Sequence, residues 1–233
     1  MIKIDNLTKK YNDQFAVKSL SLDIDEGNVL GFLGPNGAGK TTTMKMITGF
    51  ISPDTGDVKV DGLSVKDNSY AVRESIGYLP EGAPHYGEMI TKDFLEFIIK
   101  IRDIKNKDSL DFVVESLSLK NILNKRIEHL SKGFKRRVGL AQAIIHDPKY
   151  LILDEPTDGL DPNQKHDVRE LIKKISPNKT IIISTHILEE VDAICSKVSI
   201  ISEGNLVFYD TTQKFMSCDG NSNDEIFRKL TLG

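Results

Sequence analysis

The sequence predicts an α/β fold with a mostly parallel sheet, an N-terminal antiparallel β subdomain and an inserted helical subdomain. Residues 34–42 read Gly-Pro-Asn-Gly-Ala-Gly-Lys-Thr-Thr, which matches the pattern of a phosphate-binding loop between a strand and a helix. Apolar strand patterns return at 150–154 and 180–184, after a long stretch of helical periodicity at 91–146. Strands that alternate with helices indicate a parallel sheet, and the long helical stretch indicates an insertion of about 50 residues.

Residues 1–70 alternate short apolar runs with turn-forming residues at 25–27, 53–57 and 61–62. This alternation predicts strands, some of them paired as antiparallel hairpins. The segment Asn28–Leu33 reads as a buried strand directly before the phosphate-binding pattern, and Thr42–Thr48 can continue that pattern as a helix.

The phosphate-binding pattern has a clear chemical purpose. Its glycines allow successive backbone N–H groups to curl around an anion, and the helix N-terminus adds free N–H groups and partial positive charge. Lys40 is expected to reach the β- and γ-phosphates of a nucleotide, and the Thr41 hydroxyl is expected to ligate Mg²⁺. The pattern therefore predicts a P-loop NTPase core, with the candidate nucleotide-binding residues Gly34, Pro35, Asn36, Gly37, Ala38, Gly39, Lys40, Thr41 and Thr42. The alternative is a glycine-rich turn that fits the pattern by chance.

The later elements follow from hydrophobic spacing. Helical spacing is carried by Phe94, Leu95, Ile98 and Ile99, and again by Leu110, Val113, Val114 and Leu117. An amphipathic helix on Val168, Leu171, Ile172 and Ile175 separates the buried strands Tyr150–Asp154 and Thr180–Ser184. A terminal amphipathic helix is expected at Asp224–Thr231.

Composition limits the class of protein. The chain has 233 residues, of which 28% are charged and 39% hydrophobic, as in ordinary globular proteins. Its net charge of −3 gives no reason to propose a nucleic-acid ligand. The cysteines Cys195 and Cys218 have no metal-ligand spacing and suggest no disulfide framework, so a reducing cytosol is expected. No apolar run approaches the roughly 18–20 residues that span a bilayer, and no signal peptide is expected.

A second nucleotide motif follows the first in the chain. Residues 151–156 form an apolar strand that ends in Asp154 and Glu155. Asp154 is expected to hold Mg²⁺ directly or through water, and Glu155 to face the water that attacks the γ-phosphate. A pair of solvated acids at a strand end is the alternative, and it fits a buried strand poorly.

Further motifs indicate one family. Residues 130–134, Leu-Ser-Lys-Gly-Phe, open a helix and resemble the signature motif Leu-Ser-Gly-Gly-Gln of ABC-transporter ATPases. Residues 158–162 match the D-loop of that family, and Ser184-Thr-His186 matches its switch histidine. Tyr11 stands where the family has an aromatic that stacks on adenine, and Glu81 stands at the Q-loop position. The resemblance extends from about residue 2 to residue 210, with all motifs in family order.

The resemblance implies roles for individual residues. Tyr11 would stack on adenine with Val17 as an apolar neighbour, and Thr41, Asp154 and Glu81 would hold Mg²⁺. Lys40, Glu155 and His186 would act on the γ-phosphate and the attacking water. Two ATPase domains would dimerise head to tail, with Ser131 and Gly133 of one copy facing the ATP of the other and Asp161 linking the two sites. The partners implied are ATP, a second copy or a paralogous ATPase subunit, and a separate membrane-spanning permease.

Two departures from the family pattern affect details. Glu81 replaces the usual Q-loop Gln, and Lys132 and Phe134 replace Gly and Gln of the signature motif. These variants resemble those of bacterial exporters of drugs, lipids or polysaccharides. The closing segment Asp224–Thr231 also looks like the tail of that exporter subgroup, and a simple amphipathic terminal helix is the alternative. Lys132 could lie near phosphate or face solvent, and Lys135, Arg136 and Arg137 could form a solvated helix face.

The expected function is the ATP-hydrolysing subunit of a membrane exporter, peripheral on the cytoplasmic face of the inner or plasma membrane. A soluble ABC ATPase of ribosomes, DNA or cell division is the alternative, while a P-loop kinase would leave Glu155 and His186 without a purpose. One ABC domain is expected to fill residues 1–233, with a nucleotide-binding core at about 1–85 and 147–210. A helical subdomain at about 86–146 and a tail at 211–233 complete this division.

Overall fold

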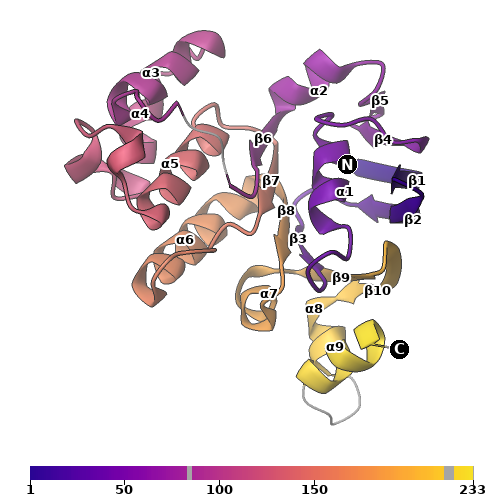
Figure 1. The fold of residues 1–233 in the computed structure, drawn as a ribbon. Helices are drawn as coiled ribbons and strands as arrows, with labels where there is room; N and C mark the ends of the chain where they lie inside the picture. The colour runs from indigo at the N-terminus through magenta and orange to yellow at the C-terminus, as the bar shows by residue number, and fades with distance from the viewer. Residues whose placement is uncertain (83–85, 218–222, 233) are drawn as a thin grey trace.

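The computed structural model describes residues 1–82, 86–217 and 223–232, and it contains two sheets (Figure 1). The smaller sheet is antiparallel and has the strand order β2-β1-β4-β5. Its strands are β1 (Ile2–Tyr11), β2 (Gln14–Ile24), β4 (Thr55–Val60) and β5 (Leu63–Ser64). These strands confirm the predicted N-terminal hairpins.

The larger sheet has the strand order β10-β9-β3-β8-β7-β6. Five strands run parallel, and β10 pairs antiparallel with β9 at the edge. The strands are β3 (Val29–Leu33), β6 (Ile76–Leu79), β7 (Tyr150–Asp154), β8 (Thr180–Thr185), β9 (Lys197–Ser202) and β10 (Asn205–Thr211). The predicted fold class, an α/β P-loop core with a mostly parallel sheet, is confirmed.

The central strands are buried on both faces, which explains their continuous apolar sequences. In β8, Ile181 and Ile183 pack into the cluster under the helices, while Ile182 faces the cluster shared with the antiparallel sheet. In β3, Leu33 and Leu30 divide between the same two clusters. The described residues therefore form two hydrophobic cores, one on each side of the larger sheet.

Helix α1 (Lys40–Ile47) follows β3 and packs between the two sheets, where it contacts β2, β7 and β8. The other helices of this part are α2 (Ser69–Ser75), α6 (Pro162–Ile175), the 3₁₀ turn η3 (Ser176–Asn178) and α7 (Leu188–Ile194). The predicted helices near 42–48 and 168–175 are present, and α1 begins two residues earlier than expected, at Lys40.

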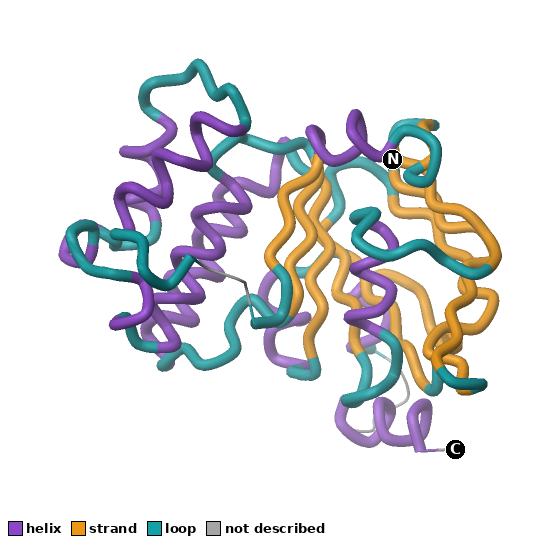
Figure 2. The backbone as a smooth tube through the Cα atoms, turned by 45° about the horizontal axis from the view of Figure 1, so that its top comes forward, coloured by secondary structure: helices purple, strands orange, loops and turns teal. Residues whose placement is uncertain are grey.

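Helices α3 (Thr91–Ile101), α4 (Ser109–Ser116) and α5 (Lys132–Ile144) gather on one side of the larger sheet, opposite β1 and β2 (Figure 1). The tube in Figure 2 shows the same separation of this helical group from most of the strands. The short 3₁₀ turns η1 (Lys120–Ile122) and η2 (Ile127–His129) lie between α4 and α5. Helix α5 lies close to β6, since a Cβ on Gly77 would lie 2.0 Å from the Ala143 carbonyl oxygen. Only glycine permits this approach.

The C-terminal part contains α8 (Thr212–Met216) and α9 (Asn223–Leu232). Helix α9 contacts β9 and β10, and its Ile226, Phe227 and Leu230 pack against the core, as the amphipathic prediction requires. Cys195 is a buried free thiol, and burial raises its pKa. Cys218 lies outside the described residues. Within the described residues, none of the helices combines the length and apolar character needed to cross a membrane.

The two-sided burial of β8 leads to a stability prediction. Ile182→Ala removes a fully buried side chain and should lower the free energy of unfolding by about 2–5 kcal/mol. Ile101→Ala is the matched control, since Ile101 is 66% exposed and its truncation should change stability by about 0.5 kcal/mol or less. Equilibrium urea unfolding measures both, and equal losses would contradict this packing.

Candidate functional site

The phosphate-binding loop joins the end of β3 to the start of α1, as its sequence predicts. Gly37 and Gly39 have φ of 82° and 106°, which L side chains rarely adopt. A Cβ on Gly39 would also lie 2.2 Å from the Ala16 carbonyl oxygen, and one on Gly34 would lie 2.4 Å from that of Ile201. The glycines are therefore required by backbone conformation and by close packing of β2 and β9 against the loop.

The loop borders a cleft of about 430 Å³. The described residues that line it are Ala16, Asn36, Gly37, Gly39, Lys40, Thr41, Thr42, Glu81 and Glu155. All of these except Ala16 are candidate site residues from the sequence. A cleft with free helix-terminal N–H groups and a lysine is suited to a phosphate group.

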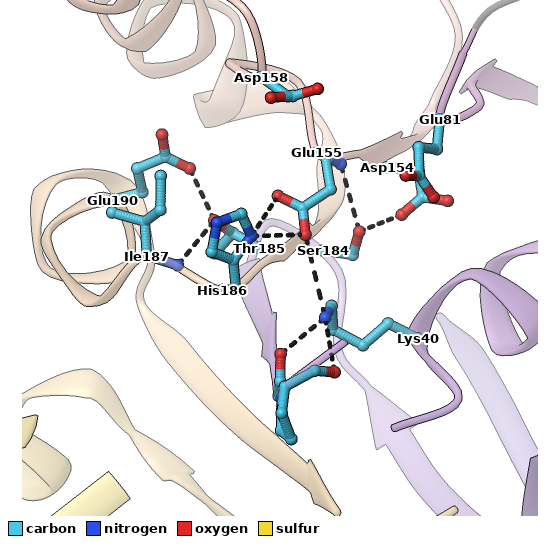
Figure 3. Close-up of polar contacts among 12 residues, drawn as sticks. Lys40, Glu81, Asp154, Glu155, Asp158, Ser184, Thr185, His186, Ile187 and Glu190 are labelled. Atoms are coloured by element: carbon cyan, nitrogen blue, oxygen red, sulfur yellow. Dashed lines mark hydrogen bonds and ion pairs between the residues drawn. The ribbon is translucent and has the colours of Figure 1, made fainter. Parts of the chain in front are cut away.

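Lys40 is the central cation of the cleft. Its Nζ donates to the carbonyl oxygens of Gly34 at 2.6 Å and Pro35 at 3.1 Å, and lies 3.9 Å from Glu155 Oε1 (Figure 3). Burial lowers the pKa of Lys40 from its ordinary value, while the nearby carboxylates of Glu155, Asp154 and Glu81 oppose this. The loop carbonyls thus hold the ammonium group where a bound phosphate could compete for it.

Glu155 lies between Lys40 and His186. Both carboxylate oxygens lie 3.1 Å from His186 Nδ1, and the three side chains form a row in Figure 3. The backbone of Glu155 has a φ of 51°, an uncommon value for a non-glycine residue that costs conformational energy. Its N–H donates to the Ser184 carbonyl at 3.1 Å, which stabilises this strained position. The strain directs Glu155 into the cleft while its neighbour Asp154 stays in β7.

Asp154 is fully buried at the end of β7, and Ser184 of β8 donates a hydrogen bond to its Oδ1. Its Oδ2 has no hydrogen-bond partner among the described residues, although it is buried. A buried carboxylate oxygen without a partner is costly, and a cation would remove the cost. Thr41 Oγ1 lies 3.4 Å from Glu81 Oε2, so these two side chains offer further oxygen atoms to a cation.

These oxygens fit Mg²⁺, which prefers oxygen ligands and usually keeps several waters and phosphate oxygens. In the described parts of the chain, no three His, Cys, Asp or Glu side chains gather closely enough to hold a metal by themselves. Residues Thr41, Asp154 and Glu81 would therefore hold the ion together with a nucleotide.

The remaining candidate residues lie outside the described lining of the cleft. Ser131 caps α5, where its side chain accepts from the Phe134 N–H, and Gly133 packs against Leu160 and Gln164. Asp161 caps α6 through the Gln164 N–H at 2.9 Å. The signature-like segment and the D-loop segment thus contact each other, and neither of these caps reaches Lys40.

Tyr11 and Val17 differ in their exposure. Tyr11 is 50% exposed at the end of β1, so its ring is accessible to a ligand. Val17 is only 1% exposed and lies 3.4 Å from the position of a Cβ on Gly39. Val17 therefore supports the phosphate-binding loop from inside the core, and it offers little surface for the expected contact with adenine.

The expectation of a solvated face at residues 135–137 is wrong for its two arginines. Arg136 and Arg137 are 8% and 7% exposed, because α5 packs that face against neighbouring segments of the chain. Lys135 is half-buried and donates to the Glu128 carbonyl. Lys132 faces solvent, which was one of the two placements expected from the sequence. It forms an ion pair with Asp158 at 2.8 Å.

One buried carboxylate beside these loops was not predicted from the sequence. Glu190 of α7 is 1% exposed and accepts hydrogen bonds from Thr157 and Thr185, the latter at 2.8 Å. Thr157 precedes the D-loop segment and Thr185 precedes His186, so one carboxylate supports both loops. The one signal for Glu190 in the sequence is its position four residues after the predicted site residue His186.

The match to a family model decides the classification. The model described as ABC transporter matches residues 17–158, which include the phosphate-binding loop, Glu81, Ser131 and Glu155. The chain belongs to the ABC transporter family. Within this family it is an ATP-binding subunit, and its predicted ATPase activity is confirmed.

Individual relatives agree with this assignment. The chain is 39% identical to the bacitracin transport ATP-binding protein BcrA of Bacillus licheniformis, over 89% of this chain and 68% of that protein. It is 36% identical to the uncharacterised ABC transporter ATP-binding protein YxlF of Bacillus subtilis, over 88% of this chain and 69% of that protein. A solved ATP-binding subunit of an ABC transporter superimposes with a TM-score of 0.89 at 26% identity, covering 99% of each chain.

A solved dimeric bacterial ABC transporter cassette has the same fold, with a TM-score of 0.82 at 24% identity, over 91% of this chain and 99% of that one. At this identity the likeness concerns the fold of the ABC ATPase alone.

The partly buried Glu155 carboxylate of this ABC ATPase leads to a prediction for pH dependence. Burial raises the pKa of Glu155, although His186 and Lys40 oppose the shift. A raised folded-state pKa stabilises the fold below the unfolded-state pKa, and this stability is lost as the pH rises through the folded-state pKa. Glu155→Gln should therefore raise the melting temperature near neutral pH. In a chain of this length, each change of about 1 kcal/mol in the free energy of unfolding shifts the melting temperature by about 2–4 °C.

Thermal unfolding in nucleotide-free buffer with EDTA measures this effect. The advantage of Glu155→Gln should shrink as the pH falls toward 4.5, the ordinary value for a glutamate pKa. Glu170→Gln is the control, because the exposed Glu170 pairs with Lys173 and its substitution should not raise the melting temperature. An advantage that stays constant across this range would contradict the raised pKa.

Proposed function

We propose that this chain binds ATP with Mg²⁺, closes head to tail on a second ATPase subunit and powers a membrane exporter. The observation that carries the proposal is the row of Lys40, Glu155 and His186 beside the phosphate-binding loop, with contacts of 3.9 Å and 3.1 Å. Lys40 and Glu155 line the cleft, and the imidazole of His186 contacts the Glu155 carboxylate from beside it. A cation, a carboxylate and an imidazole in this order suit phosphoryl transfer to water.

The proposed roles follow from position and charge. Lys40 neutralises charge on the β- and γ-phosphates, and Glu155 orients and polarises the attacking water. His186 contacts the γ-phosphate, and its hydrogen bond to Glu155 fixes the orientation of both side chains. Tyr11 stacks on the adenine. Mg²⁺, when held by Thr41, Asp154 and Glu81, supplies positive charge to the phosphate oxygens.

The proposed dimer follows from the separation of two motifs. Lys40 lines the cleft, while Ser131 and Gly133 lie at the start of α5, where they pack toward α6. A second copy or a paralogous subunit would bring its own Ser131 and Gly133 to the open side of the cleft. ATP would then favour the closed pair, and hydrolysis would release it. Asp161 would link the two sites across the interface.

The proposed permease contact lies on another face. A groove of about 240 Å³ is lined by Thr48, Phe50, Arg73, Ile76, Tyr78, Pro80, Arg102, Gly139, Gln142 and Ala143. Phe50 is 72% exposed there, and Pro80 directly precedes Glu81 of the nucleotide cleft. A helix of a permease that entered this groove would therefore act on the loop that carries a proposed Mg²⁺ ligand.

The exporter assignment is supported by the variants Glu81, Lys132 and Phe134 and by the bacitracin transport relative. The protein would then work as a peripheral subunit on the cytoplasmic face of the membrane. We also propose that the chain is one ABC domain. Its nucleotide-binding core lies at about 1–85 and 147–210, its helical subdomain at about 86–146 and its C-terminal tail at 211–233.

Glu155→Gln should retain ATP binding and lose about 100-fold or more of ATP turnover, because it removes the group that polarises water. Steady-state phosphate release measures the loss. Turnover close to that of the unsubstituted chain would remove Glu155 from this role.

The same variant tests dimerisation. Sedimentation of Glu155→Gln with ATP and Mg²⁺ should show a dimer, and omission of ATP should return the monomer. Ser131→Arg in the same background is the control, since a bulky cation at the α5 cap should prevent closure without entering the chain's own cleft. A species that stays monomeric would favour an obligate paralogous partner or no dimer.

The permease contact is tested by affinity purification from gently solubilised native membranes. A multi-span membrane protein should co-purify and raise ATP turnover. Phe50→Asp should lose it, whereas Tyr70→Asp, which changes a 76% exposed aromatic outside the groove, should retain it. Recovery of ribosomal proteins, nucleic acid or division proteins instead would favour a soluble ABC ATPase that does not transport.

A further inference from the structure

Arg136 lies in the first turns of α5, and its guanidinium group extends away from solvent toward the ends of β6 and β7. Its Nη1 donates to the Pro80 carbonyl at 2.7 Å. Its Nη2 donates to the Glu155 carbonyl at 2.6 Å and also to the Asp154 carbonyl. The side chain is 8% exposed. One buried cation thus bonds backbone atoms of two separate segments.

Both segments carry residues of the nucleotide cleft. Pro80 directly precedes Glu81, and the other two acceptors belong to Asp154 and Glu155 themselves. The two segments come from strands that are neighbours in the sheet, but each continues beyond the last backbone pair, Leu79 with Leu153. Past that pair, backbone pairing between β6 and β7 no longer sets the distance between the two segments. Arg136 bonds both segments at this point.

The chemistry of the guanidinium group suits this role. It is planar, it stays charged, and its N–H donors have a fixed fork geometry, so two backbone segments bonded to it are held at a defined spacing. The carboxylates of Asp154, Asp158, Glu155 and Glu81 all lie near enough to favour its charged form, which burial alone would disfavour. Lysine would supply charge from a single point and could not bond all these carbonyls in the same geometry.

We propose that Arg136 is a positioning residue that sets the spacing between Glu81 and Asp154, and with it the Mg²⁺ affinity of the nucleotide site. The proposal rests on the proposed function, because it assigns Thr41, Asp154 and Glu81 to the metal. It also gives α5 a mechanical connection to the site. A movement of α5, the helix that Ser131 caps, would change the spacing of the metal ligands through Arg136.

Arg137 provides a matched control on the same helix. It is equally buried, at 7% exposure, but its Nη1 donates to the Leu117 carbonyl at 3.1 Å, at the end of α4 and away from the nucleotide cleft. Substitution of either arginine removes a buried cation and should lower stability. Only substitution of Arg136 should change the metal site.

The experiment uses the full chain with Glu155→Gln, so that nucleotide is not consumed. A fluorescent ATP analogue is titrated in EDTA and at increasing Mg²⁺, and thermal unfolding is recorded for each variant. Arg136→Gln should raise the Mg²⁺ concentration that gives the half-maximal change in nucleotide binding by about 10-fold or more. Substitution of residues that hold metal ligands in place typically has an effect of this size. Arg136→Lys should give a smaller shift, and binding of the analogue in EDTA should be unchanged by either.

Arg137→Gln should lower the unfolding midpoint while leaving the Mg²⁺ dependence as in the parent chain. If the Arg136 and Arg137 variants lose stability alike and none changes the Mg²⁺ dependence, Arg136 is a structural residue only and the proposal is wrong. Should Arg136→Gln not fold, Arg136→Lys decides between these results, since it keeps the buried charge. A parent chain whose nucleotide binding ignores Mg²⁺ would instead overturn the proposed function itself.

Discussion

The cost of burying the Lys40 ammonium group governs the architecture of the site. A buried charge is tolerated only where polar groups surround it, and Lys40 is 7% exposed. The loop carbonyls of Gly34 and Pro35 bond it directly, and Glu155 lies 3.9 Å away. The loop curls back over its own lysine, and this path requires the left-handed Gly37 and Gly39. The nearby carboxylates come from the ends of β7 and β6, which lie beyond β8 in the sheet. An arriving phosphate enters a place already arranged around positive charge.

A second constraint concerns the support of the loops at the C-terminal edge of the sheet. Glu155 is held in a left-handed conformation by hydrogen bonds of its N–H to Ser184. Glu190 bonds Thr157 and Thr185 from beneath, with both threonines almost fully buried. These contacts connect β7, β8 and α7, so the loops that carry Glu155 and His186 are supported by one continuous set of polar bonds. Pre-organisation of this kind is what catalysis by positioning requires.

The elements that could be predicted from the sequence are those with strong local signals. The glycines at 34–39, the apolar runs of β7 and β8 and the heptad-like spacing in α4 each fix a local structure. The burial of Arg136 and Arg137 could not be predicted, because arginines at a helix start are usually solvated and only the packing of α5 on β6 and α4 reverses this. The burial of Val17 against the phosphate-binding loop could not be predicted either, because the loop follows in a separate segment of the chain. Long-range contacts decided each of these placements.

The strand order has a consequence for the synthesis of the protein. Strand β3, which leads into the phosphate-binding loop, is flanked by β8 and β9, so residues 29–33 find their neighbours at 180–185 and 197–202. A nascent chain that has emerged as far as α5 already contains the whole loop sequence but neither neighbouring strand. Its apolar β3 must wait, exposed or chaperone-bound, until residues 180–202 have been made. Slow or interrupted translation after α5 would therefore favour aggregation over a partly working enzyme.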